Sequence, residues 1–266
     1  MSAQTRLLPP LLAKAASAVR EGGSRLLLMR VLHKLVSPLL KFGSITFFMR
    51  DLTEALPEPK PSVEVKLRLA SPSDLPLLTE LYDHARSPEV LRDRLRRGHL
   101  CFLATTLDGT LAHSRWVTAE RAAIPELSMD IVPEPGTAYM YDGYTKLLLR
   151  GRGIDGVIRC HIFGILASLG FRAVHSYVQG DNFVGLRAAN RWQQSLARIL
   201  YFQVRGLKPL VLGSRRMRLA TFVRSSDSEP DGTGKSSRAS HRQAWLERWL
   251  SKRSAGSSAP SKSTPL

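Results

Sequence analysis

The order of strand-like and helix-like segments between residues 61 and 224 limits the fold more than any other feature of this sequence. Alternating or wholly apolar runs, typical of strands, are interleaved with capped runs of helical periodicity. The predicted strands cover 65–70, 100–106, 111–118, 124–131, 138–145, 173–178, 199–204 and 217–223, and the predicted helices cover 75–85, 88–98, 154–169 and 182–198. This order predicts an α/β domain with a mixed, mostly antiparallel sheet flanked by helices.

The segments on either side of this domain differ from it in composition. Residues 1–60 form a basic extension in which polar, mostly basic residues recur every three to four positions over 24–41, and it ends in the proline-rich linker Pro57–Pro61. The periodicity predicts an amphipathic helix that either docks on the core or lies on an anionic membrane. Residues 225–266 are rich in Ser, Gly, Pro and Lys and predict a disordered basic tail. Within it, 242–253 either caps the domain or makes a second membrane contact.

Charge is concentrated at the two ends of the chain. The formal net charge is +17, yet residues 51–186 carry fifteen Lys/Arg against seventeen acids. The first 50 residues carry eight Lys/Arg against one acid, and residues 187–266 carry sixteen against four. A domain that reads nucleic acid across its body should be basic there, so nucleic acid is the less favoured partner and an anionic membrane surface the more favoured one.

Cysteine usage and hydropathy set the expected compartment. The two cysteines, Cys101 and Cys160, lack the spacing of a metal site or of a disulfide framework, so we expect no metal. No apolar run reaches the roughly 18 residues of a membrane span. We therefore expect a cytoplasmic protein, with peripheral association at the inner face of the membrane as the alternative.

A glycine-rich turn, Arg150–Gly156, joins a predicted strand to a predicted helix. Glycines let the backbone approach a ligand closely, and the free N–H groups of a helix's first turn attract an anion, so a phosphate is the expected guest. A plain turn with solvated arginines is the simpler interpretation. The spacing of Gly151, Gly153 and Gly156, with Asp181 downstream, also matches a dinucleotide-binding fingerprint. That alternative is disfavoured because only about seventy residues follow the turn, too few for the βα units such a domain needs.

Taken together, these motifs resemble the GCN5-related N-acetyltransferase (GNAT) superfamily over residues 65–223. Val65–Ala85 is similar to the family's opening strand and helix, and Cys101–Trp116 to its following hairpin. Arg150–Ile154 is similar to its pyrophosphate-binding loop, and Leu169–Asn182 to the next strand and the Asn that opens the following helix.

The resemblance implies direct transfer of an acyl group from acetyl-CoA, or another acyl-CoA, to an amine acceptor, without a metal. It also implies the parts of the coenzyme that individual residues contact. The backbone N–H groups that would bind the pyrophosphate belong to Arg150, Gly151, Arg152, Gly153 and Ile154. The main chain of Tyr144 and Thr145 would pair with the pantetheine arm, and Asn182 would contact the coenzyme near its pantetheine or thiol end.

Two positions depart from the family pattern. Asp155 stands where the loop prefers Gly or Ala, and a carboxylate there would repel pyrophosphate unless it turns away, for example towards Arg152 or Arg159. Ala189 stands where many members carry the Tyr that protonates the leaving thiolate, so the general acid is absent or comes from elsewhere. Both departures keep open the alternative of a non-catalytic acyl-CoA-binding or scaffold protein.

A general base is expected on the aromatic strand that precedes the glycine turn. Its candidate catalytic residues are Asp142, the favoured base, with Tyr139 and Tyr141. A carboxylate in so apolar a strand is unusual, and the alternative is a buried aspartate satisfied by arginine or backbone N–H groups. Glu126 and Asp130 on the neighbouring predicted strand are further candidates.

Overall fold

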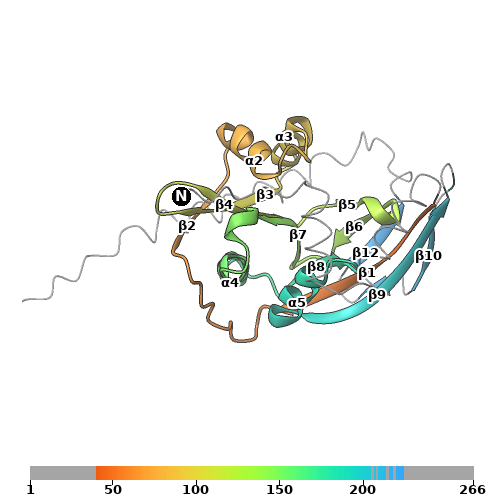
Figure 1. Ribbon diagram of the computed structural model, residues 1–266. Helices are drawn as coiled ribbons and strands as arrows, with labels where there is room; N and C mark the ends of the chain where they lie inside the picture. Colours follow the sequence, from red (N-terminus) through yellow and green to blue (C-terminus); the bar gives the residue numbers. More distant parts are fainter. Residues whose placement is uncertain (1–39, 205–206, 208, 214–215, 218–219, 225–266) are drawn as a thin grey trace, which may run out of the picture.

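The computed structural model describes residues 40–224 except 205–206, 208, 214–215 and 218–219 (Figure 1). Its strands are β1 (Leu40–Asp51), β2 (Val65–Leu69), β3 (Leu100–Thr106), β4 (Leu111–Thr118), β5 (Ala122–Ile124), β6 (Met129–Pro133), β7 (Thr137–Thr145), β8 (Ala173–Gln179), β9 (Gln194–Val204), β10 (Leu210–Leu212), β11 (Arg216–Met217) and β12 (Ala220–Arg224). Its α-helices are α2 (Leu75–Leu81), α3 (Pro88–Arg96), α4 (Ile154–Ser168) and α5 (Phe183–Trp192). Short 3-10 turns lie at Pro72–Asp74, Pro125–Leu127 and Leu147–Leu149.

The predicted mixed, mostly antiparallel sheet flanked by helices is confirmed, and a second, smaller sheet, which was not predicted, accompanies it. The large sheet has the order β10-β9-β1-β8-β7-β4-β3-β2, and the small one has the order β11-β12-β6-β5. Within the large sheet β7 and β8 are parallel, and the other neighbouring strands are antiparallel. Helices α4 and α5 cover one face of the large sheet, while α2, α3 and the small sheet cover the other (Figure 1).

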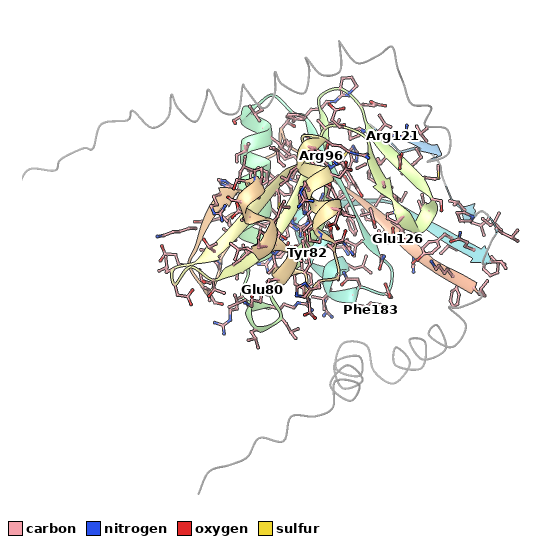
Figure 2. All side chains as sticks on the ribbon, turned by 90° about the horizontal axis from the view of Figure 1, so that it is seen from above. Glu80, Tyr82, Arg96, Arg121, Glu126 and Phe183 are labelled. Carbon is pink, nitrogen blue, oxygen red and sulfur yellow. The ribbon has the colours of Figure 1, made fainter. Side chains whose placement is uncertain are left out.

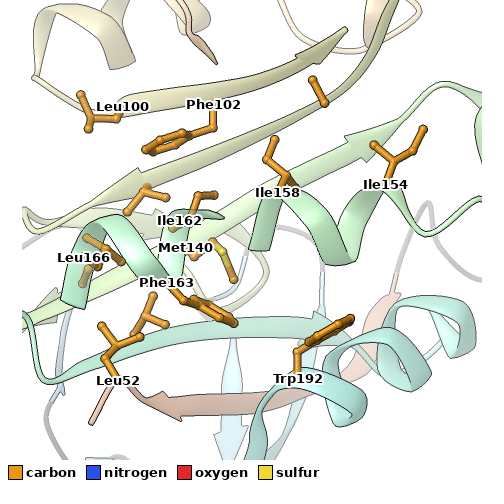
Figure 3. Close-up of a cluster of buried hydrophobic side chains, with 14 of the residues drawn as sticks. Leu52, Leu100, Phe102, Met140, Ile154, Ile158, Ile162, Phe163, Leu166 and Trp192 are labelled. Atoms are coloured by element: carbon orange, nitrogen blue, oxygen red, sulfur yellow. The ribbon is translucent and has the colours of Figure 1, made fainter. Parts of the chain in front are cut away.

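Helix α4 is fixed to the sheet by a stripe of apolar side chains. Ile154, Ile158, Ile162 and Leu166 recur every four residues and are almost completely buried. They pack with Phe163 against the apolar face of β3, β4 and β7 (Figure 3). Burying each of these side chains contributes roughly 1.5–3 kcal/mol, so the position of the helix's first turn is well determined.

Strand β1 is the main departure from the sequence-based prediction. It lies between β8 and β9 and pairs antiparallel with both, and Ile45, Phe47 and Phe48 are completely buried. The predicted boundary at residue 60 separates β1 from the strands it pairs with, so the folded domain includes Leu40–Asp51. Leu40 and Lys41, expected to end a helix over 24–41, belong to this strand. The rest of that helix and the whole tail 225–266 lie outside the described residues.

Two other predicted elements have different bounds in the structure. The strand expected over 124–131 is interrupted by the 3-10 turn at Pro125–Leu127, because Pro125 has no N–H for a ladder. The helix expected to reach Arg198 ends at Trp192. The next residue, Gln193, is extended, and its buried side-chain carbonyl accepts hydrogen bonds from Arg159 at 2.7 Å and Ser176 at 2.8 Å. These tertiary bonds end the helix where local propensity would continue it.

Candidate active site

The two parallel strands β7 and β8 separate soon after they begin. They pair only over Thr137–Tyr139 and Ala173–His175, although β7 continues to Thr145 and β8 to Gln179. We call the region where they diverge the fork. Ligands of open α/β sheets bind outside the carboxyl ends of parallel strands. The glycine turn follows β7 and Asn182 follows β8, so both predicted coenzyme-binding segments lie at the fork.

The backbone of the glycine turn has the left-handed conformation that favours glycine. Gly151 has φ +76° and Gly153, which precedes the first residue of α4, has φ +77°. A Cβ at Gly151 would meet nothing within 4 Å, whereas one at Gly153 would lie 3.1 Å from Pro61 of the linker. The linker also donates a hydrogen bond from the N–H of Ser62 to the carbonyl of Arg152 at 3.0 Å. One side of the turn is therefore backed by the linker, and Gly151 faces open space.

The arginines of the turn have different surroundings. Arg150 donates to the carbonyl of Thr145 at 3.1 Å, and its guanidinium lies 5.4 Å from the ring centre of Tyr144. Arg152 is exposed. The side chain of Thr145 bonds the Nδ1 of His113 at 2.7 Å. Thr145 and Tyr144 pair with β4 on one side, and their other side faces the fork.

Asp155 turns away from the mouth of the glycine turn, into the protein. Its carboxylate pairs with Arg115 and, at 2.8 Å, with Arg159, and it lies 3.6 Å from the Nε2 of His113. The expected contact with Arg159 is present, and the contact with Arg115 was not foreseen. Burial opposes ionisation of Asp155, but the two guanidinium groups outweigh it and hold its pKa well below the usual range. The predicted repulsion of phosphate is thereby relieved.

This buried network carries net positive charge beneath the first turn of α4. Burial and the neighbouring Arg159 lower the pKa of Arg115 to about 10, so Arg115 is still charged at neutral pH. Burial lowers the pKa of His113 to about 3, so this imidazole is neutral. Two guanidinium groups therefore face the single carboxylate of Asp155. The excess of one cation favours an anionic ligand at the helix N-terminus above it.

A β-bulge interrupts β7 at the fork. Ser114 pairs with Tyr144 and Trp116 with Tyr141, so Asp142 and Gly143 together oppose the single residue between them on β4, Arg115. Asp142 has φ +44°, and a Cβ at Gly143 would overlap the guanidinium of Arg115. Glycine at 143 thus allows both a bulge and a close approach of the Arg115 side chain. Bulges of this kind re-aim side chains next to active sites.

Asp142 is held by two arginines. Its carboxylate accepts hydrogen bonds from Arg86 at 3.1 Å and 3.2 Å and from Arg94 at 2.6 Å. Burial raises the pKa of Asp142, but Arg94 and Arg86 outweigh burial and lower it. A carboxylate paired in this way is a weak base. The geometry favours the second interpretation made from the sequence, a buried aspartate satisfied by arginine.

Three tyrosines form a row across the fork, which we call the aromatic row: Tyr141 and Tyr139 on β7 and Tyr177 on β8. The rings of Tyr139 and Tyr141 are stacked with centres 5.3 Å apart, and those of Tyr139 and Tyr177 with centres 6.3 Å apart. The hydroxyl of Tyr141 bonds the Nδ1 of His99 at 2.5 Å, while the buried hydroxyl of Tyr139 has no hydrogen-bond partner among the described residues. Burial raises the pKa of all three phenols, so they stay protonated at neutral pH.

Glu126 contacts β8, the strand across the fork from β7. It accepts hydrogen bonds from the hydroxyl of Tyr177 at 2.9 Å and from the side-chain amide of Gln179, both on β8 beyond the last residue that pairs with β7. Figure 2 shows Glu126 on the segment between β5 and β6, while Tyr82 lies at the end of α2. Asp130 instead pairs with Arg121. Glu126 thus accepts hydrogen bonds from neutral partners, whereas Asp142 and Asp130 each pair with arginine.

The two predicted features of α5 have structural roles. The side-chain oxygen of Asn182 accepts from the N–H of Gly185 at 2.8 Å and caps the helix. Ala189 is completely buried against Phe48 and Val178, so no side-chain hydroxyl is present at that position.

Arg115 and Tyr177 are the site residues that the sequence reasoning missed. A charged residue inside the apolar run 111–118 was the available signal for Arg115, since every residue of β4 is buried. Tyr177 gave no such signal, because its role depends on the segment that carries Glu126. Within the described residues, no group of three or more His, Cys, Asp and Glu side chains could hold a metal ion. No helix in the same part of the chain is long and apolar enough to cross a bilayer.

No protein-family model and no curated protein matches the sequence. Among solved structures, the chain is similar to a GCN5-related N-acetyltransferase from Sphaerobacter thermophilus at 17% identity, over 69% of this chain and 57% of that one, with a TM-score of 0.46. It is similar to a functionally unknown conserved protein from Staphylococcus epidermidis at 12% identity, over 65% of each chain, with a TM-score of 0.45. For an N-acetyltransferase from Staphylococcus aureus the identity is 14%, over 48% of this chain and 81% of that one, with a TM-score of 0.38. The chain spans less than two thirds of the length of the first two. The likeness is one of fold.

Proposed function

We propose that this protein is an acyl-CoA-dependent N-acyltransferase, in the simplest case an acetyltransferase, that moves the acyl group directly to an amine. One observation carries the proposal: the fork opens between two parallel strands, and the glycine turn with the free N-terminus of α4 lies at its mouth. A ligand with an anionic part and an extended, amide-bearing arm fits this combination. The N–H groups of the turn would bind the anion, and the backbone N–H and C=O groups along the free edge of β7 would pair with the amides. Coenzyme A has both parts.

The residues present fit such a coenzyme. The N–H groups over 150–154 would bind the pyrophosphate, with Arg150 and Arg152 as nearby cations. The buried network below them supports this role, since Arg115 and Arg159 outnumber the single carboxylate of Asp155. The edge of β7 beyond Tyr139 would pair with the pantetheine amides. We expect the thioester to lie at the end of that edge away from the glycine turn, towards Tyr141 and Tyr139.

The chemistry needs one nucleophile, one base and a stabilised leaving group. The nitrogen of a neutral amine attacks the thioester carbon, the new C–N bond forms, and the C–S bond breaks. The amine proton passes to a base, directly or through water, and the departing thiolate takes up a proton from water. We assign the base role to Glu126 and not to Asp142, because the two arginines that lower the pKa of Asp142 make it a weak base. Ala189 provides no acid for the thiolate, so water supplies that proton.

Calorimetric titration with acetyl-CoA, and separately with NAD, tests binding. The informative variant is Gly151→Asp, because an added Cβ meets no protein atom within 4 Å and the carboxylate would place negative charge at the proposed phosphate site. Gly109→Asp is the matched control, since Gly109 has φ +85° and equally open surroundings in a distant hairpin turn. We expect micromolar acetyl-CoA binding that weakens at least tenfold in Gly151→Asp and is unchanged in Gly109→Asp, with no NAD signal. Absence of acetyl-CoA binding to the unmodified protein would refute the proposal.

Release of free thiol in a screen of amines tests catalysis. Glu126→Gln should lower kcat about 10²–10⁴-fold with unchanged acetyl-CoA affinity, as removal of a general base does. Asp142→Asn is the control, and it should lower the free energy of unfolding with little change in kcat. The buried Ala189 supports one rival, a non-catalytic acyl-CoA-binding protein. That rival predicts acetyl-CoA binding without thiol release for any amine.

A further inference from the structure

An exposed apolar surface covers the end of the large sheet that lies away from the fork. Its five most exposed members are on β9 and β10, with 40% to 58% of each residue accessible to solvent: Leu200, Phe202, Val204, Leu210 and Leu212. Strand pairing places them on one side, because Leu210 lies opposite Phe202 and Leu212 opposite Leu200. Phe42 of β1 also pairs with Phe202 and extends the surface. We call these six residues the β9–β10 face.

The other side of the same strands is already buried. Ile199, Tyr201 and Val211 alternate with the exposed residues and pack into the core shared with the small sheet. Helix α5 packs on the same side of the sheet as the β9–β10 face, where it contacts Phe48 of β1. Figure 1 shows α5 beside the start of β9 and no described helix over the end next to β10. A sheet that is apolar on both sides is unusual at a surface exposed to water, and contiguous apolar patches mark sites of interaction.

The charge around the face identifies the chemistry of the partner. Residues 182–226, which include β9 and β10, contain nine Lys/Arg and no Asp or Glu. Residues 22–50, which include β1, contain five Lys/Arg and likewise no acid. Arg198 borders the face on the same side, where its guanidinium donates to the hydroxyl of Ser44 at 3.0 Å and 3.2 Å. Helix α5, which packs on this side of the sheet, carries the exposed Arg187 and Arg191. The partner must therefore accept large apolar side chains and carry negative charge.

We propose that the β9–β10 face is a docking surface for an anionic phospholipid bilayer. Leu, Val and Phe side chains insert at the boundary of headgroups and acyl chains, and Lys and Arg contact the anionic headgroups. The strands lie flat on the bilayer, so that side chains enter the membrane while the backbone of the edge strand β10 stays in the hydrated headgroup layer. This surface is part of the folded sheet, and it does not depend on the proposed acyltransferase activity.

Sedimentation of the full chain with vesicles tests the proposal. We expect binding to phosphatidylcholine vesicles that contain phosphatidylserine, weak or no binding to pure phosphatidylcholine, and weakening with added salt. Phe202→Thr with Leu210→Thr should weaken binding at least tenfold, since Thr keeps β-propensity while removing apolar surface. Leu77→Gln with Val90→Gln removes two comparably exposed apolar residues from α2 and α3 and should leave binding unchanged. If the first pair does not fold, as judged by its thermal transition, Leu210→Thr with Leu212→Thr changes only the edge strand.

Three outcomes would overturn the proposal. One is failure of the full chain to bind anionic vesicles. Another is equal binding by the chain with and without the threonine substitutions, combined with loss of binding when residues 1–39 are removed, which would assign binding to the extension. The last is a concentration-dependent dimer that the substitutions dissociate, without any vesicle binding, which would assign the face to a second copy of the chain.

Discussion

Asp155→Asn is the sharpest test of the buried network under the glycine turn. The substitution keeps the size of the side chain and removes its charge. It leaves Arg115 and Arg159, whose side chains are 7% and 4% exposed, without the carboxylate that both contact. Breaking a buried ion pair by removing one partner costs about 3–5 kcal/mol. For a domain of this size that loss lowers Tm by about 6–20 °C, at roughly 2–4 °C per kcal/mol.

Urea denaturation followed by circular dichroism measures this loss in the free energy of unfolding. Asp93→Asn is the control, because Asp93 pairs with Arg97 on the surface and should cost less than about 1 kcal/mol. Adding Arg115→Met to Asp155→Asn should restore part of the loss, since it removes one of the uncompensated charges. A cost below about 1 kcal/mol for Asp155→Asn, together with tighter acetyl-CoA binding, would show that the carboxylate faces the phosphate site and would refute its inward placement.

The remaining predictions concern β1, the helix α4 and pH. Deleting 1–39 should leave a cooperative unfolding transition, whereas deleting 1–51 removes a central strand and should abolish it; equal behaviour in circular dichroism would contradict the pairing of β1. Gly156→Ala should lower the free energy of unfolding by about 1–3 kcal/mol, because the new Cβ would lie 2.6 Å from an indole carbon of Trp192. Gly164→Ala, with its nearest atom at 3.9 Å, should instead stabilise by up to about 1 kcal/mol, and the same sign for both in thermal melts would refute the close contact. Since the pKa of His113 falls to about 3 on folding, the unfolded chain takes up a proton that the folded chain does not as pH drops below about 6.5. Stability should therefore decline with falling pH in urea titrations, and the decline should be smaller in His113→Gln.

Local sequence signals predicted the elements that depend on local chemistry. The strands predicted at 100–106, 111–118 and 138–145 and the helix predicted after the glycine turn all lie where caps and apolar spacing placed them. The same signals failed where tertiary contacts decide. Gln193 ends α5 through its buried bonds to Arg159 and Ser176, which no local pattern contains.

The sequence by itself determined the class of the fold and the candidate anion-binding turn. Glycine at 151 and 153 permits the left-handed backbone found there, and apolar residues four positions apart supply the buried stripe of α4. Only the tertiary structure decided that Asp142 is held by Arg86 and Arg94, and that Glu126 reaches β8. A carboxylate's basicity depends on which charges surround it in space, and residues as far apart as 86 and 142 become neighbours only when the sheet forms. For the same reason the sequence could not show that a strand at 40–51 completes the sheet, since ladder partners are fixed by long-range pairing.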